Sequence, residues 1–446
     1  MIERYTLPEM GKIWTELNKK SMWFDVELAA LWAKEQHGDA PKGVYESAKT
    51  IRITQEVLRR ADEIEKETDH DLIAFVLAVT ELLDEVTKRY FHSGLTSFDI
   101  EDTALALVLI DSLDLITKKM EHLKEVLLRR AKEHCRTLQI GRTHFIHAEP
   151  ITFGFKLLGW VDIIDRHIRR LESVREEIRV GKFSGAVGMY VLDPEIEELA
   201  CKHLGLRPAK VSTQIISRDL LVHYSMHMVG IVNSIDRFAT EIRHLAGTDI
   251  GEVAEFKKPG AKGSSAMPGK SMLRNPIKDE NVCGLAKVAR GYSTPAFECE
   301  IVWGERTLDN SSAERIYLPD LCILLDFILK RFSDTMEKLE VFPEQMEQNV
   351  WRTGGIVFAQ RVMMKLTERE MARNEAYDLV ENLTLSVKRG TFRNDEGESF
   401  RDLVFKNELI GKMLTAEEIA DCFNPEEALK HIDYIFEKFG IQEEEK

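Results

Sequence analysis

The sequence lacks the features that mark secreted, membrane-spanning and cysteine-metal proteins. Its six cysteines are widely scattered and form no C-x-x-C pair, which indicates reduced thiols rather than a disulfide framework. The first residues, MIERYTLPEMGKIW, contain no continuous apolar segment, and no later stretch is apolar over the length of a membrane span. We therefore expect a cytoplasmic protein that makes no membrane contact.

An excess of positive charge is also absent. The 446 residues include 76 acidic and 61 basic side chains, which gives a formal net charge of −15, so a general nucleic-acid or anionic-membrane surface is excluded. Hydrophobic residues make up 44% and charged residues 31%, a globular balance. The length exceeds what one hydrophobic core usually serves, so we expect two or three subdomains. A site for an anionic ligand must be a local cluster of Arg, Lys and backbone N–H groups.

Long amphipathic helices dominate the middle of the chain. Apolar residues from Leu105 to Leu127 recur at spacings of four and three, which predicts one helix from about 99 to 135. Similar patterns cover 153–180, 215–245, 282–290 and 318–339. Such helices pack side by side, so the predicted fold is all-α, an elongated central bundle with smaller helical N- and C-terminal domains. The apolar stripes are too long for one small bundle to cover, which predicts a homo-oligomer.

Turn signals place the predicted domain boundaries. Clusters of turn residues near 92–97 and 342–355 suggest an N-terminal domain over 1–95, a central bundle over 96–345 and a C-terminal domain over 346–446. The segment 251–276 is rich in glycine and proline and breaks the helical rhythm. A loop of this length inside a helical protein is usually functional, so we expect a mobile binding loop over 257–276.

Four polar segments interrupt otherwise ordinary helices. Each places small hydroxyls, a histidine or a lysine at a helix end or in a loop, where side chains and free backbone N–H groups can converge on a carboxylate or phosphate. They are T-D-H-D at 68–71, H-S-G-L-T-S-F-D at 92–99, G-R-T-H-F-I-H-A-E-P at 141–150 and G-S-S-A-M-P-G-K at 263–270. Together they predict an acid/base site that handles anions.

Each segment also has an alternative interpretation. Ser97 or Asp99 could cap the helix that follows. His144 and His147 have a spacing that metal ligands use, but the sequence has neither H-E-x-x-H nor a cysteine partner for them. The run S-x-x-x-x-G-K-S from Ser264 is one residue short of a Walker A motif, and the charged, proline-broken segment before it is no apolar strand. This argues against ATP or GTP hydrolysis.

The order of these motifs resembles a known group of enzymes. The loop motif followed by N-P-I-K-D-E, the histidine segment and L-T-S-F-D are similar to the corresponding segments of the fumarase/aspartase superfamily of lyases. Within it, the chain resembles the adenylosuccinate lyase family through I-E-R-Y near the start, T-D-H-D, S-T-Q-I-I-S-R-D at 212–219 and W-G-E-R-T-L-D-N-S-S-A-E-R at 303–315. The resemblance covers nearly the whole chain.

The resemblance implies an elimination reaction in purine biosynthesis. Fumarate would leave adenylosuccinate to give AMP, and leave the succinylated imidazole carboxamide ribotide (SAICAR) to give AICAR. By this resemblance Ser264 is the base, His144 is the acid that Glu280 orients, and His70 assists at the leaving side. The implied substrate-binding residues are Arg4, Tyr5, Asp71, His92, Thr96, Ser97, Thr143, Gln214, Lys270, Asn275, Arg306, Ser311 and Arg315. The resemblance implies no metal and no organic cofactor, and a homotetramer whose active sites each combine segments of three subunits.

One departure from the family pattern and two rival functions leave alternatives open. Four residues separate Lys270 from Asn275 where the family pattern has one, so either the extra residues bulge out or another residue takes the role of Lys270. A sister lyase that acts on another N-succinyl or a carboxymuconate-type compound would share the helices and Ser264. A non-catalytic, crystallin-like protein is disfavoured because Ser264, His144 and Glu280 are all present.

Overall fold

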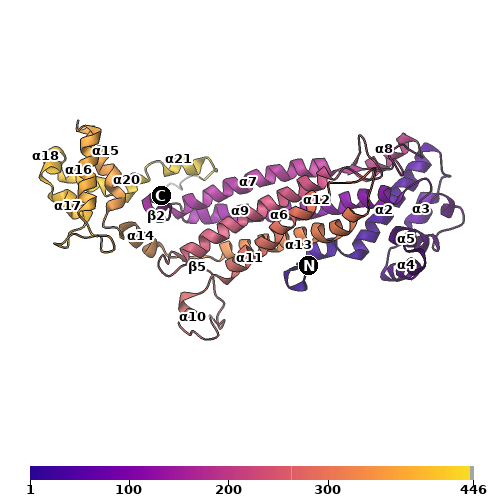
Figure 1. Cartoon of the computed structure of the whole chain (residues 1–446), viewed down its shortest axis with the longest axis horizontal. Helices are drawn as coiled ribbons and strands as arrows, with labels where there is room; N and C mark the ends of the chain where they lie inside the picture. Colours follow the sequence, from indigo (N-terminus) through magenta and orange to yellow (C-terminus); the bar gives the residue numbers. More distant parts are fainter. Residues whose placement is uncertain (263, 442–446) are drawn as a thin grey trace. The chain divides into compact units, whose positions relative to one another are not determined.

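Helices make up most of the chain in the computed structural model, which describes residues 1–262 and 264–441 (Figure 1). Strands in this part occur only as three short pairs, β1–β2, β3–β4 and β5–β6. The predicted all-α class is confirmed. Among the described residues, no helix has both the length and the apolar character that crossing a bilayer would require.

The chain divides into two compact units. Unit 1 comprises residues 1–121, 166–236 and 282–331, and unit 2 comprises 122–165, 237–281 and the chain from 332 onward. The division falls within the long helices, which are α6 (Ser97–Glu133), α7 (Phe153–Ile178), α9 (Asp219–Leu245), α11 (Ile277–Gly291) and α13 (Asp309–Glu337). The three domains expected from the sequence, 1–95, 96–345 and 346–446, stay a prediction.

The predicted and observed helix ends differ most at α13. The apolar stripe predicts a start near Leu318, but the helix begins nine residues earlier, at Asp309. Its first two turns are mostly polar, and Pro319 lies inside the helix. A proline removes one backbone hydrogen bond and usually marks a helix start, so the pattern alone places the boundary too late.

Unit 1 is built around one face of α2. The ring of Trp23 on α2 meets Phe75 on α5 edge to face, with 5.7 Å between centroids, in a core that also includes Val26, Ala30 and Phe183. The shorter elements of this unit are η1 (Glu3–Tyr5), α1 (Pro8–Ile13), α2 (Glu16–His37), α3 (Val44–Lys49), α4 (Gln55–Thr68), α5 (Asp71–Thr80), η2 (Thr87–Arg89), β3 (Val180–Gly181), α8 (Pro194–His203), β4 (Arg207–Pro208) and α12 (Ser293–Glu298).

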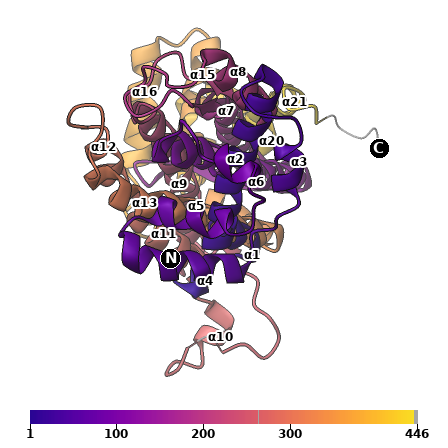
Figure 2. The same cartoon turned by 90° about the vertical axis from the view of Figure 1, so that its right-hand side faces the viewer.

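Unit 2 contains a helical core at its C-terminal end and a hairpin. Phe358, Phe400 and Phe423 pack together in the core. The shorter elements of this unit are β1 (Leu138–Thr143), β2 (Ile146–Thr152), β5 (Val253–Ala254), α10 (Lys270–Leu273), β6 (Glu340–Val341), α14 (Pro343–Trp351), η3 (Ile356–Phe358), α15 (Ala359–Glu368), α16 (Arg373–Leu385), α17 (Phe400–Lys406), α18 (Glu408–Met413), α19 (Ala416–Cys422), α20 (Pro425–Ala428) and α21 (Ile432–Glu437). In Figures 1 and 2 the segment with α10 extends away from α11.

Candidate active site

A cavity of about 330 Å³ lies in unit 1, with walls from α2, α5, α6 and α13. Three of the residues predicted to bind substrate line it, namely Asp71, Ser311 and Arg315. Nη2 of Arg315 donates to Oδ2 of Asp71 at 2.8 Å and lies 3.5 Å from Oε2 of Glu101. Burial and the negative charge of Asp71 raise the pKa of Glu101 to about 7. The cavity therefore contains an arginine held by one ionised carboxylate and one carboxyl that titrates near neutral pH.

His70 and Ser97, two of the candidate residues, lie together. His70 caps α5, and its Nδ1 accepts a hydrogen bond from the backbone N–H of Ile73 at 3.5 Å. Nε2 of the same ring is 3.4 Å from Oγ of Ser97. Because Nδ1 accepts, this geometry favours the tautomer in which Nε2 carries the proton and donates to Ser97.

Asp99 fixes the turn that contains Thr96 and Ser97. Oδ2 of this fully buried carboxylate accepts the backbone N–H of Thr96 at 2.9 Å, which supports a capping role for Asp99 at the start of α6. Oδ1 accepts the N–H of Gly185 at 3.2 Å and pairs with the buried ammonium of Lys182. The turn that carries the hydroxyl groups of Thr96 and Ser97 is thus held in place by a buried ion pair.

Gln214 and Arg306 also lie together in unit 1. Nη1 of Arg306 donates to Oε1 of Gln214 at 2.8 Å, and its guanidinium stacks 3.9 Å from the ring centre of Phe98. The neighbouring Thr213 hydroxyl donates to the carbonyl of Glu305 at 2.7 Å, which ties the two segments to each other. Stacking on an aromatic ring leaves the edge of a guanidinium free to bind an anion.

His92 is held by a buried carboxylate. Its Nδ1 lies 2.6 Å from Oε1 of Glu27, which is fully buried on α2. Burial opposes the charged ring, but the hydrogen bond to Glu27 and the negative charge of Glu27 outweigh it and raise the pKa of His92. Lys34, seven residues further along α2, donates to the carbonyls of Tyr90 and Ser93 and so holds the same turn. His92 adopts a left-handed backbone, with φ of 54°.

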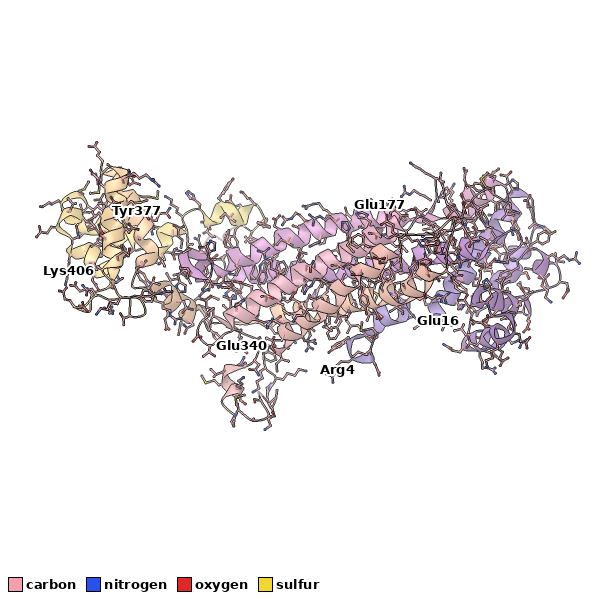
Figure 3. All side chains as sticks on the ribbon, in the orientation of Figure 1. Arg4, Glu16, Glu177, Glu340, Tyr377 and Lys406 are labelled. Carbon is pink, nitrogen blue, oxygen red and sulfur yellow. The ribbon has the colours of Figure 1, made fainter. Side chains whose placement is uncertain are left out.

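Arg4 and Tyr5 lie on the short helix η1 near the start of unit 1. The ring of Tyr5 meets Phe327 on α13 edge to face, at 5.3 Å between centroids, whereas Arg4 is exposed (Figure 3). Both residues therefore belong to the unit that carries Ser311 and Arg315.

The remaining candidates belong to unit 2, where Thr143 and His144 lie at the tip of the β1–β2 hairpin. Thr143 pairs with Ile146, so His144 and Phe145 form a two-residue turn, and their φ angles are 53° and 61°. Such turns normally use Asn-Gly, because side chains strain a left-handed backbone. The hairpin thus holds an exposed imidazole in a strained turn, where only a well-packed scaffold would keep it.

Ser264 accepts two backbone hydrogen bonds within the loop. Its Oγ lies 3.2 Å from the N–H nitrogen of Ala266 and 3.0 Å from that of Met267. Hydrogen bonds from N–H groups stabilise an oxygen that carries negative charge. The geometry therefore favours a serine that gives up its proton more easily than a solvated one. Gly263, the first residue of the loop motif, lies outside the described residues.

The extra residues between Lys270 and Asn275 form a single helical turn. This turn is α10, and Arg274 follows it with a φ of 49°. Nη1 of Arg274 donates to the carbonyl of Glu255 at 3.2 Å and pairs with Glu340, which is labelled in Figure 3. The insertion thus folds compactly and is anchored to unit 2. Glu280 is exposed in the first turn of α11.

Two buried carboxyl groups join the ends of this loop. Glu255, just after β5, accepts the backbone N–H groups of Lys278 and Asp279 at 3.1 and 2.9 Å. Asp279 is fully buried, and burial, followed by the charge of Glu255, raises the pKa of Asp279 to about 8. Asp279 is therefore expected to keep its proton in the folded protein at neutral pH.

Replacement of Asp279 with asparagine is expected to stabilise unit 2 at neutral pH. In the wild type, the unfolded carboxyl ionises above its ordinary pKa near 4 while the folded one stays protonated, so stability falls as pH rises from about 4 to about 8. An amide avoids this loss and can donate to Glu255. In urea denaturation, we expect the free energy of unfolding to rise by about 2 kcal/mol at pH 7.5 and by less at pH 5. Equal gains at both pH values, or the same gain from the exposed Asp378→Asn control, would contradict it.

One group of side chains in the described part has metal-ligand spacing, and none of the candidate residues above belongs to it. His37, Asp193 and Glu195 place one ligand atom each within 4.8 Å of the others. Asp193 caps the N-terminus of α8, whose partial positive charge opposes a cation. His144 and His147 are not part of this group.

Sequence reasoning missed several residues of the unit 1 cavity. Lys20, Phe98 and Glu101 line it, yet each lies on a helix where periodicity suggests only a core or a solvated face. Lys20 stands three positions before the buried Trp23 on α2, and this placement on an apolar face is the signal that could have identified it.

Comparisons with known proteins agree along the whole chain. The family model described as "Lyase" matches residues 3–291, and the model "Adenylosuccinate lyase C-terminus" matches 355–439. The adenylosuccinate lyase of a Synechocystis strain is 44% identical over 99% of this chain and 100% of its own length. That of Bacillus subtilis is 43% identical over the same shares. A fumarate lyase structure from a Mesorhizobium strain has a TM-score of 0.86 at 23% identity, over 98% of this chain and 99% of its own. This chain belongs to the adenylosuccinate lyase family of the fumarase/aspartase superfamily of lyases.

Proposed function

We propose that this enzyme releases fumarate from adenylosuccinate to give AMP, and from SAICAR to give AICAR, in purine biosynthesis. The full-length relatives named above are adenylosuccinate lyases, which favours these substrates over other N-succinyl or carboxymuconate-type compounds. The observation that carries the chemistry is the pair of backbone N–H groups directed at Oγ of Ser264. This arrangement suits a serine that acts as a base.

The reaction is an acid/base elimination across one carbon–carbon bond of the succinyl group. Ser264 reacts as an alkoxide, stabilised by the loop N–H groups and by Lys270, and takes a proton from the carbon beside one carboxylate to become a neutral hydroxyl. The electron pair forms the alkene, and the bond from the next carbon to nitrogen breaks. His144 gives a proton to the departing nitrogen, with Glu280 orienting its ring, so fumarate and AMP form in equal amounts. Histidine is a common general acid, and the exposed turn leaves the imidazole of His144 accessible to a substrate.

Charge that develops on the carboxylate must meet donors already in place. Thr96 and Ser97 on their fixed turn, Thr143, Lys270 and Asn275 fill this role in the proposal, with Gln214 nearby. His70 and Asp71 bind the leaving side, and His92 contributes an imidazolium. The nucleotide phosphate binds to Arg4, Tyr5, Ser311 and Arg315. Arg306 lies toward the purine base or the ribose of the substrate.

The proposed assembly is a cytoplasmic homotetramer in which neighbouring subunits complete each active site. The candidate residues are divided between unit 1 and unit 2. Large apolar side chains also stay exposed in the single chain, including Met189 at 79%, Val191 at 75% and Val211 at 87%. Exposed apolar surface of this kind usually marks a protein interface. No nucleic acid, membrane, metal or organic cofactor takes part in the proposal.

The substrate range can be tested with a panel of compounds. Purified enzyme with excess chelator is expected to release equal amounts of fumarate and AMP from adenylosuccinate, and to act on SAICAR, because every proposed step uses groups of the protein alone. Fumarate and nucleotide are both quantified by chromatography. Turnover of a carboxymuconate or a non-nucleotide N-succinyl compound with none of adenylosuccinate would refute the assignment, and loss of activity to the chelator would refute the metal-free mechanism.

A further inference from the structure

The cavity of unit 1 contains a buried cation that no carboxylate of the described residues contacts directly, although carboxylates line the same cavity. Lys20 on α2 lines this cavity, and the residue is only 8% exposed. Its ammonium lies 3.5 Å from the ring centre of Trp23 and 5.6 Å from that of Phe75. No carboxylate within ion-pairing distance accompanies it in the part of the chain that the structure describes. Burial lowers the pKa of Lys20 to about 8, although the charge of Asp71 partly opposes this.

Three other buried cations of the same unit have polar partners in direct contact, and Lys34 among them donates to the carbonyls of Tyr90 and Ser93. Lys182 pairs with Asp99, and Arg218 pairs with Asp102 and Glu314. A buried charge without such a partner is costly, and an aromatic ring replaces only part of the lost hydration. A bound anionic ligand would offset the free energy that burial of the Lys20 charge costs.

The neighbours of Lys20 indicate which anion fits. Ser311 and the guanidinium of Arg315 line the same cavity, and Arg315 is held by Asp71 at 2.8 Å. An ammonium, a hydroxyl and a guanidinium around one space supply the several donors that a phosphate with three terminal oxygens accepts. The cavity volume of about 330 Å³ exceeds what a phosphate alone needs and suits part of a nucleotide.

We propose that Lys20 is a ligand of the nucleotide phosphate and completes, with Ser311 and Arg315, an anion subsite in this cavity. The inference rests on the proposed function, which places the phosphate at Ser311 and Arg315. Lys20 adds a specificity-determining cation that favours phosphorylated over dephosphorylated ligands. It contributes binding energy at a distance from the bonds that break.

The binding test compares AMP with adenosine by calorimetry and uses two lysine variants. Lys20→Met removes the charge and keeps the apolar stem, and we expect it to weaken AMP binding by about 10- to 100-fold, the usual worth of a charged hydrogen bond. Adenosine binding should change less than about twofold. The matched control is Lys19→Met, because Lys19 lines the same cavity but is more exposed and already pairs with Glu16 at 3.5 Å. It should leave AMP binding within about threefold.

Three results would overturn the assignment of Lys20. They are unchanged AMP binding in Lys20→Met, equal losses for AMP and adenosine, and a loss in Lys19→Met as large as in Lys20→Met. Failure to fold is not expected, because the substitution removes an unpaired buried charge, and the Tm should equal or exceed that of the wild type. AMP binding involves no turnover, so an enzyme inactive on adenylosuccinate would refute the proposed function without deciding the role of Lys20.

The pH dependence of AMP binding gives a second readout. The charged or titratable groups that line the cavity with the ammonium are Glu16, Lys19, Asp62, Glu65, Asp71, Glu101, Asp102, Glu314 and Arg315. Burial raises the pKa of Glu101 to about 7. Affinity of the wild type should fall as pH rises above about 8, because Lys20 loses its proton there. Lys20→Met retains Glu101 and should lack this decline. A decline of the same size in both proteins would also overturn the proposal.

Discussion

Alanine at position 264 is expected to lower kcat for adenylosuccinate by between about 10² and 10⁴-fold, the range that a positioned base usually contributes. Removal of Oγ leaves no group in the loop turn to accept the proton. The two N–H groups of Ala266 and Met267 would then have no oxygen to stabilise. The measurement is steady-state fumarate release, with thermal denaturation to verify that the variant is folded.

A structural effect of the same substitution has a different kinetic signature. Ser264 also closes a local turn, so alanine could loosen the loop and weaken binding of substrate. Loss of a contact made equally in ground and transition states raises KM and spares kcat, whereas loss of the base lowers kcat. The neighbouring, exposed Ser265 offers a matched control, and Ser265→Ala should retain kcat within about threefold. A wild-type kcat in Ser264→Ala would show that another group is the base.

Periodicity of apolar residues was sufficient to predict the long helices but not their polar ends. The stripe from Leu105 to Leu127 predicts α6 well because that helix buries one face along its whole length. It fails at the start of α13, where the first turns are polar. The β1–β2 hairpin could not be predicted from its turn, because His144 and Phe145 occupy positions where Asn-Gly would be the usual signal.

The candidate site was likewise only partly predictable from the sequence. Motifs identified Asp71, Ser311 and Arg315, which the fold brings to one cavity, and His70 with Ser97, which lie 3.4 Å apart. Lys20 and Glu27 escaped notice because each is an ordinary charged residue in a helix. The burial of their side chains distinguishes them. The position of Lys20 on the apolar face of α2 hints at this burial, but burial of a charge depends chiefly on tertiary contacts.

Arg218 is expected to be the residue of unit 1 whose loss destabilises the fold most strongly. Its guanidinium binds Asp102 through Nη1 and Nη2 at 2.6 and 2.9 Å, and Glu314 through Nε and Nη2 at 2.9 and 3.1 Å. All three side chains are at least nine-tenths buried. Arg218→Met would leave two carboxyl groups facing each other without a cation, and breaking such a buried pair costs about 3–5 kcal/mol.

The matched control is a surface arginine of the same unit. Arg175 pairs with Asp114 at 2.9 Å, but the two side chains are 38% and 55% exposed, so Arg175→Met should cost at most about 1 kcal/mol. Urea denaturation at several protein concentrations separates loss of the fold from dissociation of an oligomer. Similar losses in the two variants would contradict the expectation.

The deficit of Arg218→Met should also depend on pH. Burial raises the pKa of Glu314 even in the wild type, where Arg218 opposes the shift, and removal of the arginine must raise it further. A carboxyl whose folded pKa exceeds its unfolded value loses stability as pH rises between the two. The deficit should therefore be larger at pH 8 than at pH 5, and Glu314→Gln in the same chain should reduce it at pH 8. Asp102 and Glu314 also line the cavity with Lys20. Arg218→Met should therefore weaken the binding of AMP and of adenosine alike, unlike Lys20→Met.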